Sequence, residues 1–255
     1  IGLSLMFGIR MPENFNSPYK AASIIDFWRR WHITLSRFFR DYLYVPLGGN
    51  RVGLFRRNLN VLTVMLLAGL WHGANWKFVF WGGLHGFYLL ANHAWREHCS
   101  WRFPKVVGVT LTFIAVAIAW VPFRADSFES AVAVYRGMVG LNGIILPLHY
   151  QSLLPAGGGA LLSQLGVRFG ALSVYGGAAQ LAVLAGLLFF VWGLPNTQQL
   201  TANYSPTLGT DAYPIPHWQR WRPGLLSGVI AGLTLAYLGL LAIQGKAGEF
   251  IYFQF

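Results

Sequence analysis

Residues 59–95 form an apolar stretch of 37 residues in which Lys77 is the only Lys, Arg, Asp or Glu. A single straight helix of that length would extend about 55 Å, whereas the hydrocarbon core of a bilayer is about 30 Å thick. We therefore expect a broken pair of helices, with the break at or near the turn His72–Trp76. Non-helical backbone at membrane depth is tolerated where it is buried in protein or lines a watery cavity, so the break implies a cavity around His72. Glycines interrupt the stretch at Gly69, Gly73, Gly82, Gly83 and Gly86.

The composition is that of a membrane protein. Only 11% of the 255 residues are charged, 55% are hydrophobic, and the mean hydropathy is +0.47. Soluble domains carry about 25% charged residues. Three further runs contain no Lys, Arg, Asp or Glu and are each long enough for a transmembrane helix. These runs are residues 106–123, 177–194 and 224–244.

The basic residues are concentrated near the start of the chain. Nine of the 19 Lys and Arg fall between Arg10 and Arg57, and the formal net charge is +11. A short basic segment beside apolar spans is typical of a cytoplasmic loop that faces anionic lipid, so we do not expect a nucleic-acid partner. We predict that residues 10–57 form a cytoplasmic or interfacial amphipathic region. Simple charge-based topology also puts 96–105 and 195–223 on the cytoplasmic side and 124–176 outside.

His32 lies in the motif DFWRRWHITLS (residues 26–36). If this motif is one helix, His32, Ser36 and Trp28 share a face, and His32 could line the same cavity as His72. The plainer alternative is an interfacial helix whose basic side chains reach the lipid headgroups.

His72 lies in the motif GLWHGANW (residues 69–76). An ionisable side chain at membrane depth is costly, which makes it a functional-site hypothesis. A neutral imidazole can take a proton near pH 7, as a general base for hydroxyl acylation must. Asn75 could orient His72 or donate to a developing oxyanion, and Trp71 would shape the pocket. The alternative role for His72 is a hydrogen bond between helices. A third histidine in the apolar stretch, His85, is more simply explained by packing against a neighbouring helix.

The group Arg37, Arg40 and Asp41 has two interpretations. It is either a solvated cytoplasmic face or the mouth that attracts an anionic, phosphate-bearing acyl donor. No metal-ligand spacing, phosphate loop, dinucleotide fingerprint or nucleophile elbow occurs in the sequence, so we expect no metal and no bound cofactor.

The motifs together resemble the membrane-bound O-acyltransferase (MBOAT) family, in the branch that acetylates alginate and related polysaccharides. The resemblance rests on residues 27–36, on FRDYLYVPLGGNR (39–51), on LWHGANW (70–76) with WGGLHG (81–86), and on the ending EFIYFQF (249–255).

This resemblance implies an all-α integral membrane fold, multi-span, with a membrane-embedded funnel and interfacial or re-entrant helices. The chain would be a single membrane-embedded domain over 1–255, the C-terminal part of a larger protein in the bacterial inner membrane. His72 matches the near-invariant histidine of the family, and His32 its second polar position. The implied acyl donor is acetyl-CoA, and the implied partners are the bilayer, a polysaccharide acceptor and periplasmic acetyltransferase proteins.

Two alternatives stay open at this point. Enzymes that attach D-alanine to teichoic acid share the general pattern, so the acyl group and acceptor are less defined than the reaction. A membrane transporter subunit would also combine broken helices with a polar residue at the midplane.

Overall fold

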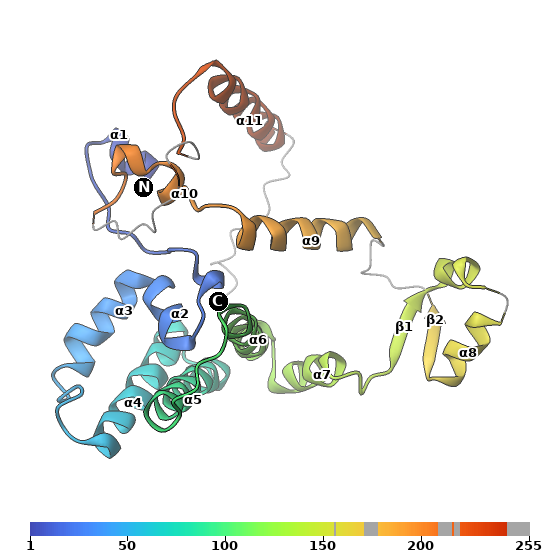
Figure 1. Ribbon diagram of the computed structural model, residues 1–255, viewed down its shortest axis with the longest axis horizontal. Coiled ribbons are helices and arrows are strands. Elements are labelled where there is room, and N and C mark those ends of the chain that lie inside the picture. Colours follow the sequence, from blue (N-terminus) through green and yellow to red (C-terminus); the bar gives the residue numbers. More distant parts are fainter. Residues whose placement is uncertain (156, 171–177, 209–215, 217–219, 244–255) are drawn as a thin grey trace. The chain divides into compact units, whose positions relative to one another are not determined.

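The computed structural model describes residues 1–155, 157–170, 178–208, 216 and 220–243. Helices account for most of these residues, as the sequence predicts (Figure 1). Contacts divide the chain into two compact units. The first combines the described residues of 1–18, 28–38 and 195–255, and the second combines those of 19–27 and 39–194. The single domain expected over 1–255 stays a prediction.

The second unit is built around a hairpin of two long helices, α4 (Leu54–His72) and α5 (Trp76–His98), which lie side by side (Figure 1). The break expected within 59–95 falls between them. A Cβ atom on Gly69 would lie 2.2 Å from the carbonyl oxygen of Phe78, and one on Gly82 would lie 2.2 Å from that of Met65. The two backbones therefore approach too closely for any side chain at these positions, as small residues allow in membrane helix pairs.

Helix α6 (Lys105–Arg124) packs against α5, and α7 (Phe128–Met138) packs against α6. The Tyr135 hydroxyl on α7 donates a hydrogen bond to the carbonyl oxygen of Ile118 on α6, at 2.9 Å. A further apolar helix, α9 (Ala178–Gly193), is attached through the Trp192 indole, which donates to the backbone of Tyr19 at 3.1 Å.

The three predicted apolar spans correspond to α6, α9 and α11 (Leu225–Ile243). Among the described residues, α6 and α11 are long and apolar enough to cross a bilayer by length and composition. Helix α9 has 16 described residues, and residues 171–177 before it lie outside the described part.

A small sheet corrects the all-α prediction. Strands β1 (Ile144–Pro147) and β2 (Val167–Gly170) pair in parallel, with Ile144 opposite Val167. Both strands are short and contain β-branched residues, a pattern favourable to strands, but four residues are too few to separate a strand from a helix by periodicity. The connection between them contains η3 (Leu148–Leu153) and α8 (Gly158–Gln164).

In the first unit, polar contacts join the beginning of the chain to residues 195–200. The Asn196 amide donates to Asn16 Oδ1 at 2.8 Å and to Ser17 Oγ at 2.9 Å, and it also caps the short helix α10 (Thr197–Leu200). The remaining helical elements among the described residues are α1 (Gly2–Met6), η1 (Pro18–Lys20), α2 (Ile24–Arg30), α3 (Ile33–Phe39), η2 (Arg40–Tyr44) and η4 (Ala202–Tyr204). The motif 249–255 lies outside the described residues.

Candidate functional site

His72 is the last residue of α4, and the chain leaves the helix immediately after it. Gly73 has φ 160° and ψ 152°, an extended conformation that ends the helix. Asn75 then begins α5, because its side-chain oxygen accepts a hydrogen bond from the Lys77 backbone N–H at 3.1 Å. A Cβ atom on Gly73 would lie 2.7 Å from the Phe78 ring, so the turn is also sterically tight. The local sequence thus places the imidazole at the turn that connects the two helices of the hairpin.

Aromatic rings surround the His72 imidazole. Trp71, Trp81 and Phe123 meet it edge to face, at centroid distances of 5.0, 5.2 and 5.1 Å. Phe78 lies at 6.5 Å in a tilted arrangement. Such rings fix the orientation of the imidazole through packing, and they reduce its access to water. The imidazole itself is half-buried.

Lys77 connects this cluster to α6. Its ammonium donates a hydrogen bond to the Ala125 carbonyl oxygen at the end of α6, at 3.0 Å, and lies 5.0 Å from the Phe78 ring centroid. A cation at a helix C-terminus is favourable because the last carbonyl groups have no partner within the helix. The contact holds the last turn of α6, which carries Phe123, beside His72. Sequence alone gave no signal for Phe123 or for this use of Lys77, since both depend on packing between α5 and α6.

The structure limits the role predicted for Asn75. Its side-chain oxygen is engaged in capping α5, so only the amide N–H groups are left to orient His72 or to donate to an oxyanion. Trp71 is 58% exposed and contacts the imidazole with one edge. Two cavities among the described residues, one between α5, α6 and residues 22–24 and one between α4, α5 and Phe128, are lined by residues other than His72. A cavity at this imidazole stays a prediction.

His85 lies one helical turn beyond Trp81 on α5 and is fully buried. Its ring contacts Trp81 at 4.8 Å and stacks on Phe27 at 6.1 Å, with an interplanar angle of 13°. The packing role that the sequence favoured for His85 agrees with this position. Trp81 contacts both His85 and His72, so the two histidines share one aromatic neighbour.

The single helix predicted through His32 is wrong. Helix α2 ends at Arg30 and α3 begins at Ile33. His32 between them has φ +44°, in the left-handed region that non-glycine residues rarely adopt. Trp28 therefore lies on α2 and His32 in the turn between the two helices, so they do not share a helical face. A left-handed residue of this kind is strained, and such strain is concentrated at functional sites.

Asn14 explains the break at His32. Its carbonyl oxygen accepts from the Ile33 N–H at 2.9 Å, and its side-chain oxygen accepts from the Thr34 N–H at 3.2 Å and the Thr34 hydroxyl at 2.9 Å. Asn16 donates its N–H to the carbonyl oxygen of Arg30 at 2.9 Å, which terminates α2. The segment around Asn14 thus satisfies the free ends of both helices and offsets the strain at His32. No local pattern indicated this contact, because it joins residues 20 positions apart.

The His32 ring is half-buried and lies 6.0 Å from the Phe15 ring. Burial lowers the pKa of His32 below its ordinary value, and a backbone hydrogen bond opposes part of this shift. The imidazole is therefore neutral at pH 7, the form that can accept a proton. Ser36 donates its hydroxyl to the Trp31 carbonyl oxygen at 3.3 Å, and Trp28 is half-buried.

The predicted donor mouth, Arg37, Arg40 and Asp41, is exposed. Arg40 and Asp41 form an ion pair, with Nε–Oδ1 at 2.7 Å and Nη2–Oδ2 at 3.2 Å. They open a π-helical turn, η2, a rare conformation that is frequent at functional sites. An exposed ion pair of this kind is compatible with either predicted role, so anion attraction by these residues stays a prediction.

The candidate site therefore consists of two parts, each within its own unit: the aromatic cluster of His72 and the strained turn of His32. Among the described residues no group of three or more His, Cys, Asp or Glu could hold a metal ion. A half-buried imidazole is suited to proton transfer.

The match to known proteins covers the same region. A family model described as MBOAT, membrane-bound O-acyltransferase family, matches residues 1–129, just over half of the chain. The chain belongs to the membrane-bound O-acyltransferase family. The resemblance predicted from its motifs is thus confirmed, and the chain is that of a membrane protein.

Three relatives illustrate the range of similarity. The peptidoglycan O-acetyltransferase of Helicobacter pylori is 53% identical over 150 residues, which are 57% of this chain and 28% of that protein. The probable alginate O-acetylase of Azotobacter vinelandii is 47% identical over 138 residues, 54% of this chain and 28% of that protein. The teichoic acid D-alanyltransferase of Bacillus subtilis is 28% identical over 145 residues, 51% of this chain and 36% of that protein. The chain spans about a third or less of the length of these relatives.

Proposed function

We propose that this chain carries catalytic residues of a membrane O-acyltransferase that acetylates a polysaccharide of the bacterial cell envelope. The observation that carries the proposal is His72, a half-buried imidazole at a helix break within a cluster of aromatic rings. The family relation and the names of the relatives, which include acetyltransferases for peptidoglycan and alginate, support the same reaction.

The proposed donor is acetyl-CoA and the proposed acceptor is a sugar hydroxyl. The His72 imidazole takes the hydroxyl proton while the hydroxyl oxygen attacks the thioester carbonyl. The C–S bond then breaks, the proton passes to the departing thiolate, and the products are an acetyl ester and free coenzyme A. General-base catalysis of this kind contributes about 10²- to 10⁴-fold to the rate.

The other members of the site have supporting roles in the proposal. The neutral His32 is a second proton acceptor or a hydrogen-bond partner for the reactants, and the exposed Arg37 and Arg40 attract the phosphates of the donor. The protein would be multi-pass in the inner membrane, with α6, α9 and α11 as spans and with periplasmic acetyltransferase proteins as partners.

The test replaces His72 by Ala in the intact protein and measures transfer of radiolabelled acetyl from acetyl-CoA to the polymer. We expect a loss of at least about 100-fold, with the protein still inserted in the membrane. The matched control is His98→Ala, at the far end of α5, which should retain activity. Wild-type transfer in the His72 variant would overturn the proposal. Transfer of D-alanine instead of acetyl would move the activity to the teichoic-acid branch, and solute uptake without transfer would favour a transporter.

A further inference from the structure

The end of the α4–α5 hairpin that lies away from His72 carries a concentration of positive charge. Residues 51–57 and 96–105 contain six Lys and Arg against one acid, Glu97. We call these six side chains the basic rim, which consists of Arg51, Arg56, Arg57, Arg96, Arg102 and Lys105. The proposed acyl transfer assigns no role to any of them.

An ion pair joins the two helices at this end of the hairpin. Helix α4 begins at Leu54, and the antiparallel α5 ends at His98. The Arg57 guanidinium pairs with the Glu97 carboxylate, with Nη1–Oε1 at 2.5 Å. The pair neutralises one charge of the basic rim and places the start of α4 beside the end of α5.

Arg102 adds the start of α6 to the same place. Its guanidinium donates hydrogen bonds to the carbonyl oxygens of Cys99 at 2.5 Å and Arg96 at 3.3 Å. These bonds satisfy carbonyl groups that have no partner at the end of α5, and they hold the connection between α5 and α6 against that helix. Lys105, three residues further on, is the first residue of α6.

The other four members of the basic rim are exposed, namely Arg51, Arg56, Arg96 and Lys105. Within the described part of the chain, none of these four side chains forms an ion pair or a side-chain hydrogen bond. Like charges gathered at one end of a hairpin repel one another, so an anionic partner stabilises the arrangement.

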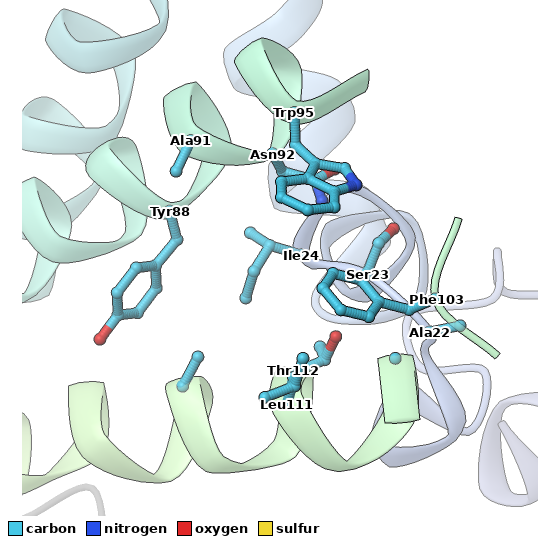
Figure 2. A pocket seen from close by; sticks show the side chains of 12 residues that line it. Ala22, Ser23, Ile24, Tyr88, Ala91, Asn92, Trp95, Phe103, Leu111 and Thr112 are labelled. Carbon is cyan, nitrogen blue, oxygen red and sulfur yellow. The ribbon is translucent and has the colours of Figure 1, made fainter. Parts of the chain in front are cut away.

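Aromatic side chains accompany these charges. Phe55 and Trp101, each next in sequence to an arginine of the basic rim, are 84% and 58% exposed. The rings of Trp95 and Phe103 stack, with centroids 5.1 Å apart and planes inclined by 16° (Figure 2), and Trp101 meets Phe103 at 4.6 Å. Aromatic rings beside basic side chains at the ends of apolar helices are typical of the membrane–water interface. A face turned to bulk water would instead leave the exposed rings hydrated, which is unfavourable.

We propose that the basic rim is a binding surface for the headgroups of anionic phospholipids. The exposed guanidinium and ammonium groups bind the headgroup phosphates, and the rings of Phe55 and Trp101 lie among the glycerol groups and the first carbons of the acyl chains. Each Lys or Arg near an anionic membrane surface strengthens binding about fivefold, so several together select anionic over zwitterionic lipid. The proposal does not depend on the proposed acyl transfer.

The test titrates the intact protein in neutral detergent with pyrene-labelled phosphatidylglycerol and measures energy transfer from tryptophan to pyrene. Unlabelled phosphatidylglycerol and phosphatidylcholine with the same acyl chains are the matched competitors. We expect phosphatidylcholine to compete at least about tenfold more weakly, and added salt to weaken the binding of phosphatidylglycerol. Equal competition by the two lipids would overturn the proposal. Displacement by free glycerol 3-phosphate or by coenzyme A would also overturn it, because the basic rim would then bind a soluble phosphate compound.

Variants test whether the lipid binds at the basic rim. Arg56→Gln and Lys105→Gln each remove one exposed charge and should weaken phosphatidylglycerol binding about fivefold, and the double variant about 20-fold or more. The matched control is Arg124→Gln, which removes one exposed charge at the other end of α6, two residues before Asp126, and should leave the binding unchanged. Wild-type binding in the double variant would overturn the proposal. Equal effects of Lys105→Gln and Arg124→Gln would also overturn it, because the affinity would then follow the net charge of the protein and not this surface.

Discussion

His32 and His72 both stand where a helix is interrupted, but the two interruptions are made in different ways. At His72 the local sequence ends the helix, because Gly73 adopts an extended conformation that terminates α4 and Asn75 caps the start of α5. At His32 no glycine or proline is present, and the break is imposed by Asn14, which bonds Thr34 across a separation of 20 residues. The first imidazole is fixed by aromatic rings, and the second by a strained backbone that polar contacts hold. The break at His72 is therefore specified by the local sequence, and the break at His32 by tertiary contacts.

The largest expected effect concerns the hairpin that carries His72. In Gly82→Ala the new Cβ would lie 2.2 Å from the Met65 carbonyl oxygen, which cannot move without displacing α4. Overpacking of this kind costs about 1–3 kcal/mol or more, so we expect a lower melting temperature and loss of folded protein. The control is Gly83→Ala, where the nearest atom is 3.6 Å away in a Leu66 side chain. The control should be neutral or slightly stabilising, because Ala favours a helix over Gly. Equal behaviour of the two variants would show that the close approach of α4 and α5 is not required.

The second prediction separates the backbone of His32 from its imidazole. His32→Gly tolerates the positive φ, whereas His32→Ala places a Cβ in the left-handed region at a cost of about 1–2 kcal/mol relative to Gly. We expect both variants to reduce acetyl transfer by a similar factor, smaller than that of His72→Ala, and we expect the Gly variant to melt at a higher temperature than the Ala variant. Acetyl transfer and thermal unfolding, measured on the same preparations, give the result. Full activity in His32→Gly would reduce His32 to a structural turn residue.

The sequence predicted those features that depend on neighbours along the chain. The hairpin break after His72 and the apolar ranges of α6 and α11 follow from local patterns. It did not predict the break at His32, the pairing of β1 with β2, or the position of Phe123 at His72. Each of these depends on residues that are distant in the chain, and periodicity carries no information about such contacts.

The third prediction compares two asparagines that cap helices at the two sites. Asn14→Ala removes an acceptor from the Thr34 N–H and hydroxyl, and Asn75→Ala removes one from the Lys77 N–H. Loss of such a cap costs about 0.5–2 kcal/mol, and we expect Asn14 to be near the upper limit because it also restrains the strained His32. Thermal unfolding of both variants measures the difference, and Asn14→Asp, which keeps the oxygen, should recover most of the stability. A larger effect at Asn75 than at Asn14 would contradict this comparison.

The smallest expected effect is a dependence of stability on pH at His32. Burial lowers the pKa of this imidazole in the folded chain, so the unfolded chain binds a proton at a higher pH than the folded one does. The contribution of His32 is therefore fully present above about pH 6.5, the ordinary histidine pKa, and is lost as the pH falls through the lowered value. His32→Asn removes the titrating group and still tolerates a positive φ. Melting temperatures between pH 8 and pH 5 should fall less steeply for this variant than for the wild type. If the two curves are parallel, the His32 imidazole has the same proton affinity in the folded and unfolded chain, and its burial does not control its charge.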